Sequence, residues 1–247
     1  MDLNLTKRTA LVTGGAKRLG RETALALAGA GARVAISYRN SETEAQELVD
    51  EIKALGVDCW ALKADLTVQS DLDGLIDRVL DAAGSLDILI NNSSVFPASD
   101  FATFTLDELI NSIKIDAWAP LALGRHFARK VGKGHIVNML DSRYLGYDWF
   151  HVAYHASKYL LGLFTREMAI KFAPDIAVNA IAPGLILPPE GKGADYLESL
   201  KDRVPLKRIG DPKYIADAIL YLVTSEYITG QVLYIDGGRS LNEVSIG

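Results

Sequence analysis

The sequence predicts a single α/β domain, residues 1–247, built on a doubly wound parallel sheet of about seven strands. Short apolar runs, which are typical of strands buried on both faces, alternate along the whole chain with longer segments of helical spacing. The sequence contains no repeat of fixed period, no low-complexity tract and no linker. Because each helix of such a chain returns it to the next parallel strand, we expect helices on both faces of the sheet.

In the first half of the chain, apolar runs that stop at glycine or polar residues predict strands over 9–13, 33–38, 57–64 and 86–90. The segments between them place leucine and alanine at helical spacing, and several end at glycine. They predict helices over 19–31, 42–55 and 68–83.

In the second half, the same patterns predict strands over 135–140, 176–181 and 231–235, and helices over 106–131, 152–172 and 212–223. We expect the first of these helices to break near Pro120. Segment 185–208 interrupts the alternation, with Pro188, Pro189 and Gly191 before a short amphipathic piece. An insertion of this length at the carboxyl end of a strand predicts a mobile lid over a ligand; a packed excursion is the alternative.

The composition is that of a globular protein and excludes several functions. The 26 basic residues are scattered among 31 acidic ones, for a net charge of −5, so no nucleic-acid partner is expected. No apolar run is long enough for a membrane helix, and no secretory signal is readable. The single cysteine, Cys59, excludes an internal disulfide, and the histidines show no metal-ligand grouping. We therefore expect a cytoplasmic protein that binds no membrane and no metal.

The turn after the first expected strand is rich in glycine and carries Gly14, Lys17, Arg18 and Leu19. Glycine lets the chain turn tightly and approach a diphosphate, while the amides of the following helix point at the negative charge. Alone, such a turn is equally well explained as a tight connection. Its place in the first strand–helix–strand unit favours a Rossmann-type dinucleotide site.

The end of the second expected strand indicates which dinucleotide is bound. NAD-specific proteins usually carry an acid there that accepts the ribose hydroxyls. This chain instead has Tyr38, Arg39, Asn40 and Ser41, with Lys17 on the same side, which suits the 2′-phosphate of NADP(H). Asp65, which precedes Leu66 after the third strand, is expected to accept the adenine amino group; a surface acid is the alternative.

Tyr154 and Lys158 are four residues apart in an expected helix and therefore lie on one face. A free phenol has a pKa of about 10, and a neighbouring cation favours its ionised form, so the pair suits proton transfer near neutral pH. Asp141 and Ser142 end the preceding strand, where a hydrogen-bonding partner for the phenol is expected.

Together these residues resemble the short-chain dehydrogenases/reductases along the whole chain. The motifs that carry the resemblance are the 13–20 turn, Asn91-Asn92, Tyr154 with Lys158, and the segments 179–184, 228–231 and 236–238. The resemblance implies that Tyr154 is the proton donor, that Lys158 holds the nicotinamide ribose, and that Gly14 and Asn91 form the cofactor floor. The expected cofactor-binding residues are Gly14, Lys17, Arg18, Leu19, Tyr38, Arg39, Asn40, Ser41, Asp65, Leu66, Asn91, Ser93, Ser94, Tyr154, Lys158, Pro183 and Gly184.

Several positions depart from the usual pattern of that superfamily and resemble its pteridine reductase branch. Arg18 replaces a glycine, Asp141 replaces the catalytic serine, and Ser93-Ser94 followed by Phe96 replaces an alanine and glycine. The branch implies that Arg18 reaches the phosphates and the pterin, that Ser94 contacts both ligands, and that Phe96 stacks on the pterin. Asp141 then works beside the tyrosine. The expected catalytic residues are Asp141, Tyr154 and Lys158, and the expected substrate-binding residues are Arg18, Ser94, Phe96, Asp141 and Tyr154.

The chemistry of a pterin supports this interpretation, because a flat heterocycle favours an aromatic face and polar groups at its edge. For Phe96 the alternative is an ordinary packing role, and for Asp141 it is a cap with Ser142 as the catalytic serine. Asp116 stands where many relatives have an asparagine; it is expected either to pair with Lys158 or to anchor a water.

The sequence thus predicts an NADPH-dependent reductase of a small pteridine such as dihydrobiopterin, dihydromonapterin or dihydrofolate. The alternatives are a carbonyl reductase acting, for example, on 3-oxoacyl thioesters, and a non-catalytic NADP(H)-sensing module. By resemblance, the helices over 106–131 and 152–172 are expected to form a homotetramer.

Overall fold

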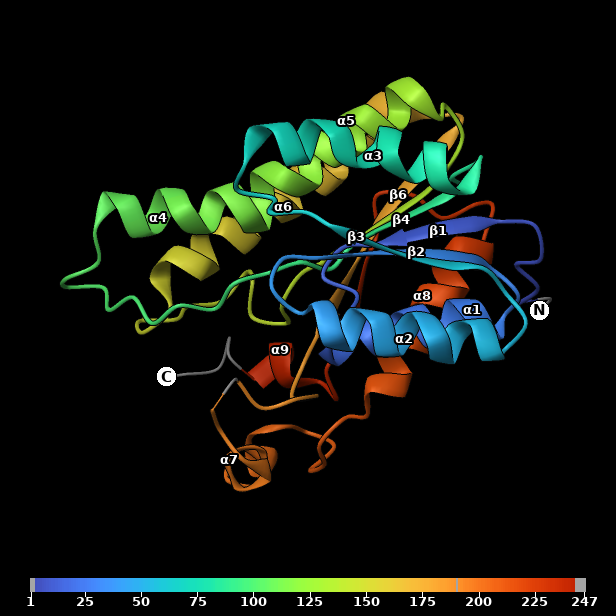
Figure 1. Cartoon of the computed structure of the whole chain (residues 1–247). Helices are drawn as coiled ribbons and strands as arrows, with labels where there is room; N and C mark the ends of the chain where they lie inside the picture. Colours follow the sequence, from blue (N-terminus) through green and yellow to red (C-terminus); the bar gives the residue numbers. More distant parts are fainter. Residues whose placement is uncertain (1–2, 190, 243–247) are drawn as a thin grey trace.

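A computed structural model describes residues 3–189 and 191–242 (Figure 1). Within these residues it contains one seven-stranded sheet, all parallel, in the order β3-β2-β1-β4-β5-β6-β7. The strands are β1 (Thr9–Val12), β2 (Arg33–Tyr38), β3 (Cys59–Lys63), β4 (Ile88–Asn91), β5 (Gly134–Met139), β6 (Ile176–Pro183) and β7 (Val232–Ile235). The predicted fold class is confirmed.

Helices cover both faces of the sheet (Figure 1). One layer consists of α1 (Arg18–Gly29), α2 (Glu42–Ala54) and α8 (Pro212–Thr224). The other consists of α3 (Gln69–Ala83), α4 (Leu106–Ile113), α5 (Ala119–Lys130) and α6 (Val152–Phe172). A separate apolar core lies on each side, which explains why the central strands are buried throughout.

The expected helix over 106–131 is divided by a π-helical turn, Lys114–Trp118, between α4 and α5. Pro120 lies in the first turn of α5, where its missing amide hydrogen leaves no hydrogen bond unmade. The break therefore precedes the proline. The π turn places Asp116 in the interior, where its side chain is fully buried.

Segment 185–208 leaves the carboxyl end of β6 and carries α7 (Ala194–Glu198) and a short 3₁₀ turn (Lys201–Arg203). Figure 1 shows α7 apart from the helix layers, on the side where α9 (Arg239–Asn242) lies. The segment has a small apolar cluster of its own, formed by Leu185, Leu197 and Val204. The segment is thus packed; its motion as a lid stays a prediction.

The strand order reverses between β1 and β4. The helix that follows β1 (α1) and the helices that follow β4 (α4 and α5) cover opposite faces of the sheet. In open α/β sheets, ligands bind beyond the carboxyl ends of the strands at this switch point. Among the described residues, no helix is both long and apolar enough to cross a membrane.

Candidate active site

A cleft of about 990 Å³ opens at the carboxyl ends of β1, β2, β4, β5 and β6. It collects most of the residues that the sequence predicted. The predicted residues that line it are Gly14, Lys17, Arg18, Leu19, Tyr38, Arg39, Asp65, Leu66, Ser93, Ser94, Phe96, Asp141, Tyr154, Lys158, Pro183 and Gly184. Asn40, Ser41 and Asn91 do not line it.

The turn after β1 is shaped for close approach of a ligand to the backbone. Gly14 has φ +61°, and a Cβ there would lie 2.9 Å from Ser93 Oγ. A Cβ on Gly20, in the first turn of α1, would meet Asn92 Nδ2 at 2.6 Å. Side chains are therefore excluded at Gly14 and Gly20, and the start of α1 lines the cleft, where the amides of a helix N-terminus favour an anion.

Arg18 adopts φ +56°, a backbone conformation that glycine reaches freely and other residues rarely adopt. A strained non-glycine residue in a cleft suggests a functional side chain. The Arg18 guanidinium donates to the Pro188 carbonyl and so connects the phosphate turn with segment 185–208.

Basic and acidic groups surround the end of β2. Arg39 lines the cleft, and Lys17 pairs with Glu44 at 2.6 Å. Asp65 Oδ1 accepts hydrogen bonds from the Thr67 amide at 2.9 Å and the Thr67 hydroxyl at 2.7 Å. Burial opposes ionisation of Asp65, but these bonds and Arg39 lower its pKa overall. At this end of the cleft, Arg39 can pair with a phosphate, and the Asp65 carboxylate can accept a hydrogen bond.

Asn91, which is expected in the cofactor floor, does not line the cleft. Its Nδ2 donates to Asn138 Oδ1 at 2.8 Å, because the two residues are register partners on β4 and β5. Its neighbour Asn92 reaches the turn instead, and donates to the Thr13 and Gly14 carbonyls at 2.9 and 3.1 Å. Asn91 is the last residue of β4 and Asn92 follows the strand, and only Asn92 lines the cleft.

At the other end of the cleft, Tyr154 and Lys158 lie on the same face of α6. The Tyr154 hydroxyl donates to Asp141 Oδ2 at 3.3 Å, while Lys158 Nζ donates to the Met139 carbonyl at 2.8 Å. The ammonium also lies 5.5 Å from the centre of the Tyr154 ring. Asp141, not Ser142, thus faces the phenol; Ser142 is buried and does not line the cleft.

The phenol is surrounded by more negative charge than the sequence suggested. Burial raises the pKa of Tyr154 well above its ordinary value, and the carboxylates of Asp141 and Asp116 raise it further. The net direction is opposite to the expected effect of Lys158, because burial and the two carboxylates dominate and favour the protonated phenol.

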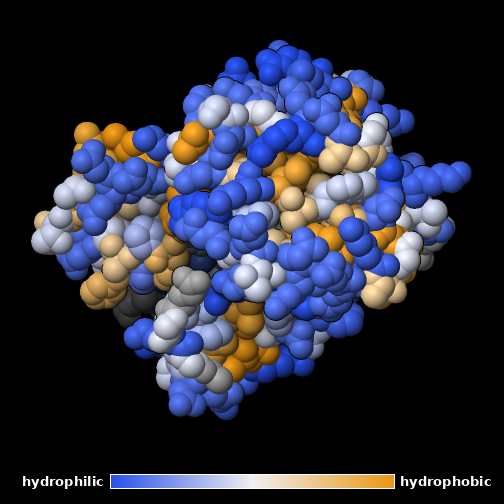
Figure 2. Space-filling model, in the orientation of Figure 1, coloured by the Kyte–Doolittle hydropathy of each residue, from blue (hydrophilic) through white to orange (hydrophobic). Residues whose placement is uncertain are grey.

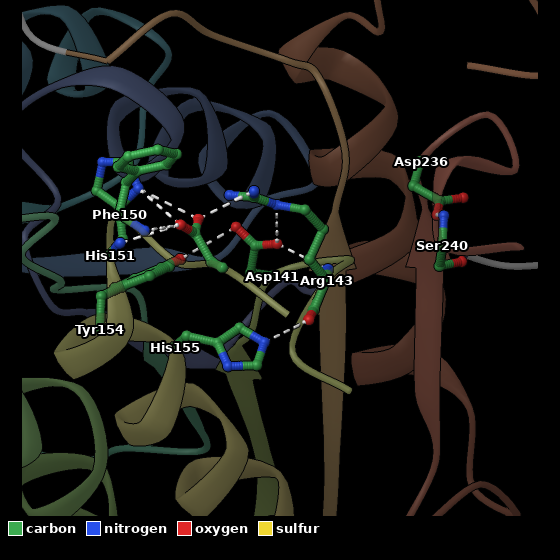
Figure 3. Close-up of polar contacts among 9 residues, drawn as sticks. Asp141, Arg143, Phe150, His151, Tyr154, His155, Asp236 and Ser240 are labelled. Carbon is green, nitrogen blue, oxygen red and sulfur yellow. Dashed lines mark hydrogen bonds and ion pairs between the residues drawn. The ribbon is translucent and has the colours of Figure 1, made fainter. Parts of the chain in front are cut away.

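Asp141 is held by the segment that follows β5. Its Oδ1 accepts from the Arg143 amide at 2.7 Å and lies 3.7 Å from Arg143 Nε. Figure 3 shows Asp141 between Tyr154 and Arg143, with His155 bound to the Arg143 carbonyl on the other side. These contacts orient Asp141 Oδ2 towards the Tyr154 hydroxyl.

Phe96 lies beside this group, with 39% of its surface exposed. Its ring stacks on His151 at 4.0 Å and meets Tyr154 edge-on at 4.7 Å. His151 is held in turn by Asp148, whose carboxylate lies 3.2 Å from His151 Nδ1 and 3.0 Å from Arg143 Nη1. His151 and Asp148 therefore hold the Phe96 ring in place beside the hydrogen-bonded pair of Tyr154 and Asp141 (the acid pair).

Arg143, Asp148 and His151 were not predicted as site residues from the sequence. They lie in an irregular segment without periodicity, and their contacts depend on how the chain folds back onto residues 95–105. The only available signal was the alternation of charges around Asp141.

A parallel sheet of this order, with a glycine-lined cleft at its switch point, defines the class of doubly wound dinucleotide-binding proteins. A family model described as enoyl-(acyl carrier protein) reductase matches residues 14–240. The chain belongs to the short-chain dehydrogenase/reductase family, whose members are oxidoreductases.

Relatives span more than one activity. Dihydromonapterin reductase of Enterobacter sp. is 31% identical and aligns with 97% of this chain and 99% of its own length. A 3-oxoacyl-[acyl-carrier-protein] reductase of Synechocystis sp. is 32% identical, over 95% of this chain and 97% of its own. The structure of FolM alternative dihydrofolate reductase 1 from Brucella suis, in complex with NADP, superposes with a TM-score of 0.91, 30% identity and coverage of 98% and 97%.

Proposed function

We propose that the protein is an NADPH-dependent reductase of a pteridine-type substrate: dihydrobiopterin, dihydromonapterin or dihydrofolate. The observation that carries the proposal is the pairing of Asp141 with Tyr154 beside the exposed ring of Phe96. A pterin lying on Phe96 would present its polar edge to the acid pair. Dihydromonapterin reductase and the FolM reductase among the relatives support this substrate class.

The cleft fits NADP(H). The turn at Gly14 leaves room for a diphosphate, Arg39 and Lys17 would hold the 2′-phosphate, and Lys158 would hold the nicotinamide ribose. Asn40 and Ser41, at the start of α2, stay predicted contacts. When bound, the cofactor supplies the hydride. The FolM reductase structure, solved with NADP, supports this choice.

The chain's own residues supply the proton. Tyr154 Oη, protonated because of its buried and negatively charged surroundings, would donate to the substrate nitrogen. Asp141 orients the hydroxyl through its 3.3 Å contact. Serine, the usual residue here, mainly polarises a carbonyl oxygen, whereas a carboxylate suits the donors at the edge of a pterin.

A 3-oxoacyl-thioester reductase is the second candidate, because such enzymes are similar to this chain at the same level of identity. Oxidation of NADPH with a dihydropterin, dihydrofolate and acetoacetyl thioester, assayed in parallel, separates the two. The proposal predicts turnover of a reduced pteridine. Turnover of the thioester alone would reject it, and cofactor binding without any turnover would favour a sensing module.

We further propose that the chain forms a homotetramer. Figure 2 shows hydrophobic residues gathered on the outer surface of α4. Leu106 and Ile110 are exposed there, and Tyr159, Leu163 and Ile170 are exposed on α6. Apolar faces on two helices that pack together favour burial between subunits. Sedimentation of the purified chain tests the assembly.

A further inference from the structure

Asp116 is a fully buried carboxylate that the proposed reaction does not use. It lies in the π turn Lys114–Trp118, directly behind the catalytic face of α6. Its Oδ1 lies 3.3 Å from Lys158 Nζ and accepts from the Ser94 hydroxyl at 2.5 Å and the Val95 amide at 3.4 Å. Its Oδ2 is buried and receives no hydrogen bond from the described residues.

Three donors therefore converge on one oxygen of Asp116, and one of them is the ammonium of Lys158. Burial raises the pKa of Asp116, while Lys158, Ser94 and Val95 favour its ionised form. Lys158 Nζ and Asp116 Oδ1 lie 3.3 Å apart inside the protein, so the two opposite charges form a pair without net charge.

We propose that Asp116 is a positioning residue that balances the charge of Lys158 and thereby keeps Tyr154 in its protonated, proton-donating form. With an asparagine at this place, the Lys158 ammonium acts on the phenol unopposed. With a carboxylate, that influence is cancelled and the proton-donating form of Tyr154 persists to higher pH. The inference rests on the proposed role of Tyr154 as proton donor, although not on the identity of the substrate.

The charged and titratable groups around the pair come from several elements. Lys158 and Tyr154 belong to α6, Asp116 to the π turn, and Asp141 and Arg143 to the segment after β5. Arg143 lowers the pKa of Tyr154, whereas Asp141 and Asp116 raise it. Asp116 both pairs with the lysine and raises the pKa of the phenol, whereas Asp141 bonds to the phenol directly, so replacing Asp116 leaves the Asp141 contact in place.

The test is the Asp116→Asn variant, which has nearly the same shape and still accepts from Ser94. Tyrosinate absorbance of the full chain is followed against pH in the wild type, in Asp116→Asn and in Tyr154→Phe, which identifies the Tyr154 step. Removing the negative charge is expected to move that step down by about one to three pH units. The matched control is Asp107→Asn, an exposed acid in the first turn of α4, for which no movement is expected.

A Tyr154 step that stays in place, moves up, or is absent below the pH of unfolding in Asp116→Asn would overturn the proposal. Asp116→Ser, a smaller uncharged residue, gives the same test if the asparagine variant does not fold. Because the titration uses no substrate, it can succeed even if no pteridine is reduced. With any substrate that turns over, the alkaline limit of reduction should move down by the same amount.

Discussion

Replacing Asp141 by serine tests the assignment of the acid pair. The carboxylate accepts the Tyr154 hydroxyl at 3.3 Å and is oriented by the Arg143 amide at 2.7 Å. Serine is too short to reach both partners, so the phenol loses a charge-assisted hydrogen bond. Such bonds contribute about 1.5–3 kcal/mol. At about 1.4 kcal/mol per factor of ten, kcat/KM for a dihydropterin should fall roughly 10- to 100-fold.

The assay is NADPH oxidation with a reduced pterin, together with the dissociation constant of NADPH. The Asp141→Ser protein should bind NADPH normally, because Asp141 is placed at the substrate end of the cleft. Ser142→Ala is the matched control, since Ser142 is buried and faces away from the phenol, and it should retain pterin reduction. Unchanged rates in Asp141→Ser, or loss of activity only in Ser142→Ala, would refute the reasoning.

Three further predictions concern the cleft and the core. Phe96→Ala should raise KM for the pterin roughly 3- to 10-fold, because a stacked aromatic contact contributes about 0.5–1.5 kcal/mol. Phe101 is exposed on the same segment and does not line the cleft, so Phe101→Ala should leave KM unchanged. Equal effects of the two substitutions in steady-state kinetics would exclude stacking on Phe96. Arg39→Ala should weaken NADPH binding roughly 10-fold or more while leaving NADH binding unchanged, as measured by fluorescence titration, and equal losses would show that Arg39 does not contact the 2′-phosphate. Burial, then Arg8, lowers the pKa of His135 to about 4, so the folded state binds this proton less readily than the unfolded state, and the free energy of unfolding should decrease as the pH falls from about 6.5 towards 4. Denaturant unfolding of His135→Gln should show a flatter dependence over this range, and an unchanged slope would contradict the assignment.

The sheet could be predicted from the sequence because its signals are local. Apolar runs and the glycine or polar residues that end them place the described strands near their observed positions, since strands buried on both faces leave little freedom of composition. The interruption of the 106–131 helix was expected near Pro120 and lies just before it, but its π-helical form was not predicted, because the turn Lys114–Trp118 has no distinct hydrophobic period. Its position depends on packing between α4, α5 and α6.

The site was predictable where function depends on spacing along one element. Tyr154 and Lys158 share a helical face whatever surrounds them, and Arg18 follows directly from its place in the turn. The different contacts of the two adjacent asparagines could not be foreseen, because Asn91 pairs with Asn138 of the neighbouring strand while Asn92, just after β4, bonds to the turn. The support of Phe96 by His151 and Asp148 could not be foreseen, since it joins two irregular segments that meet only in the folded chain.

A crystal structure of the chain with NADP⁺ and a pterin analogue is the most direct test of the account. We predict that the heterocycle lies flat between the Phe96 ring and the nicotinamide, with its polar edge within hydrogen-bond distance of Tyr154 and Asp141. A closed slot, or one filled by an acyl chain with the Asp141 carboxylate turned to solvent, would contradict the substrate assignment.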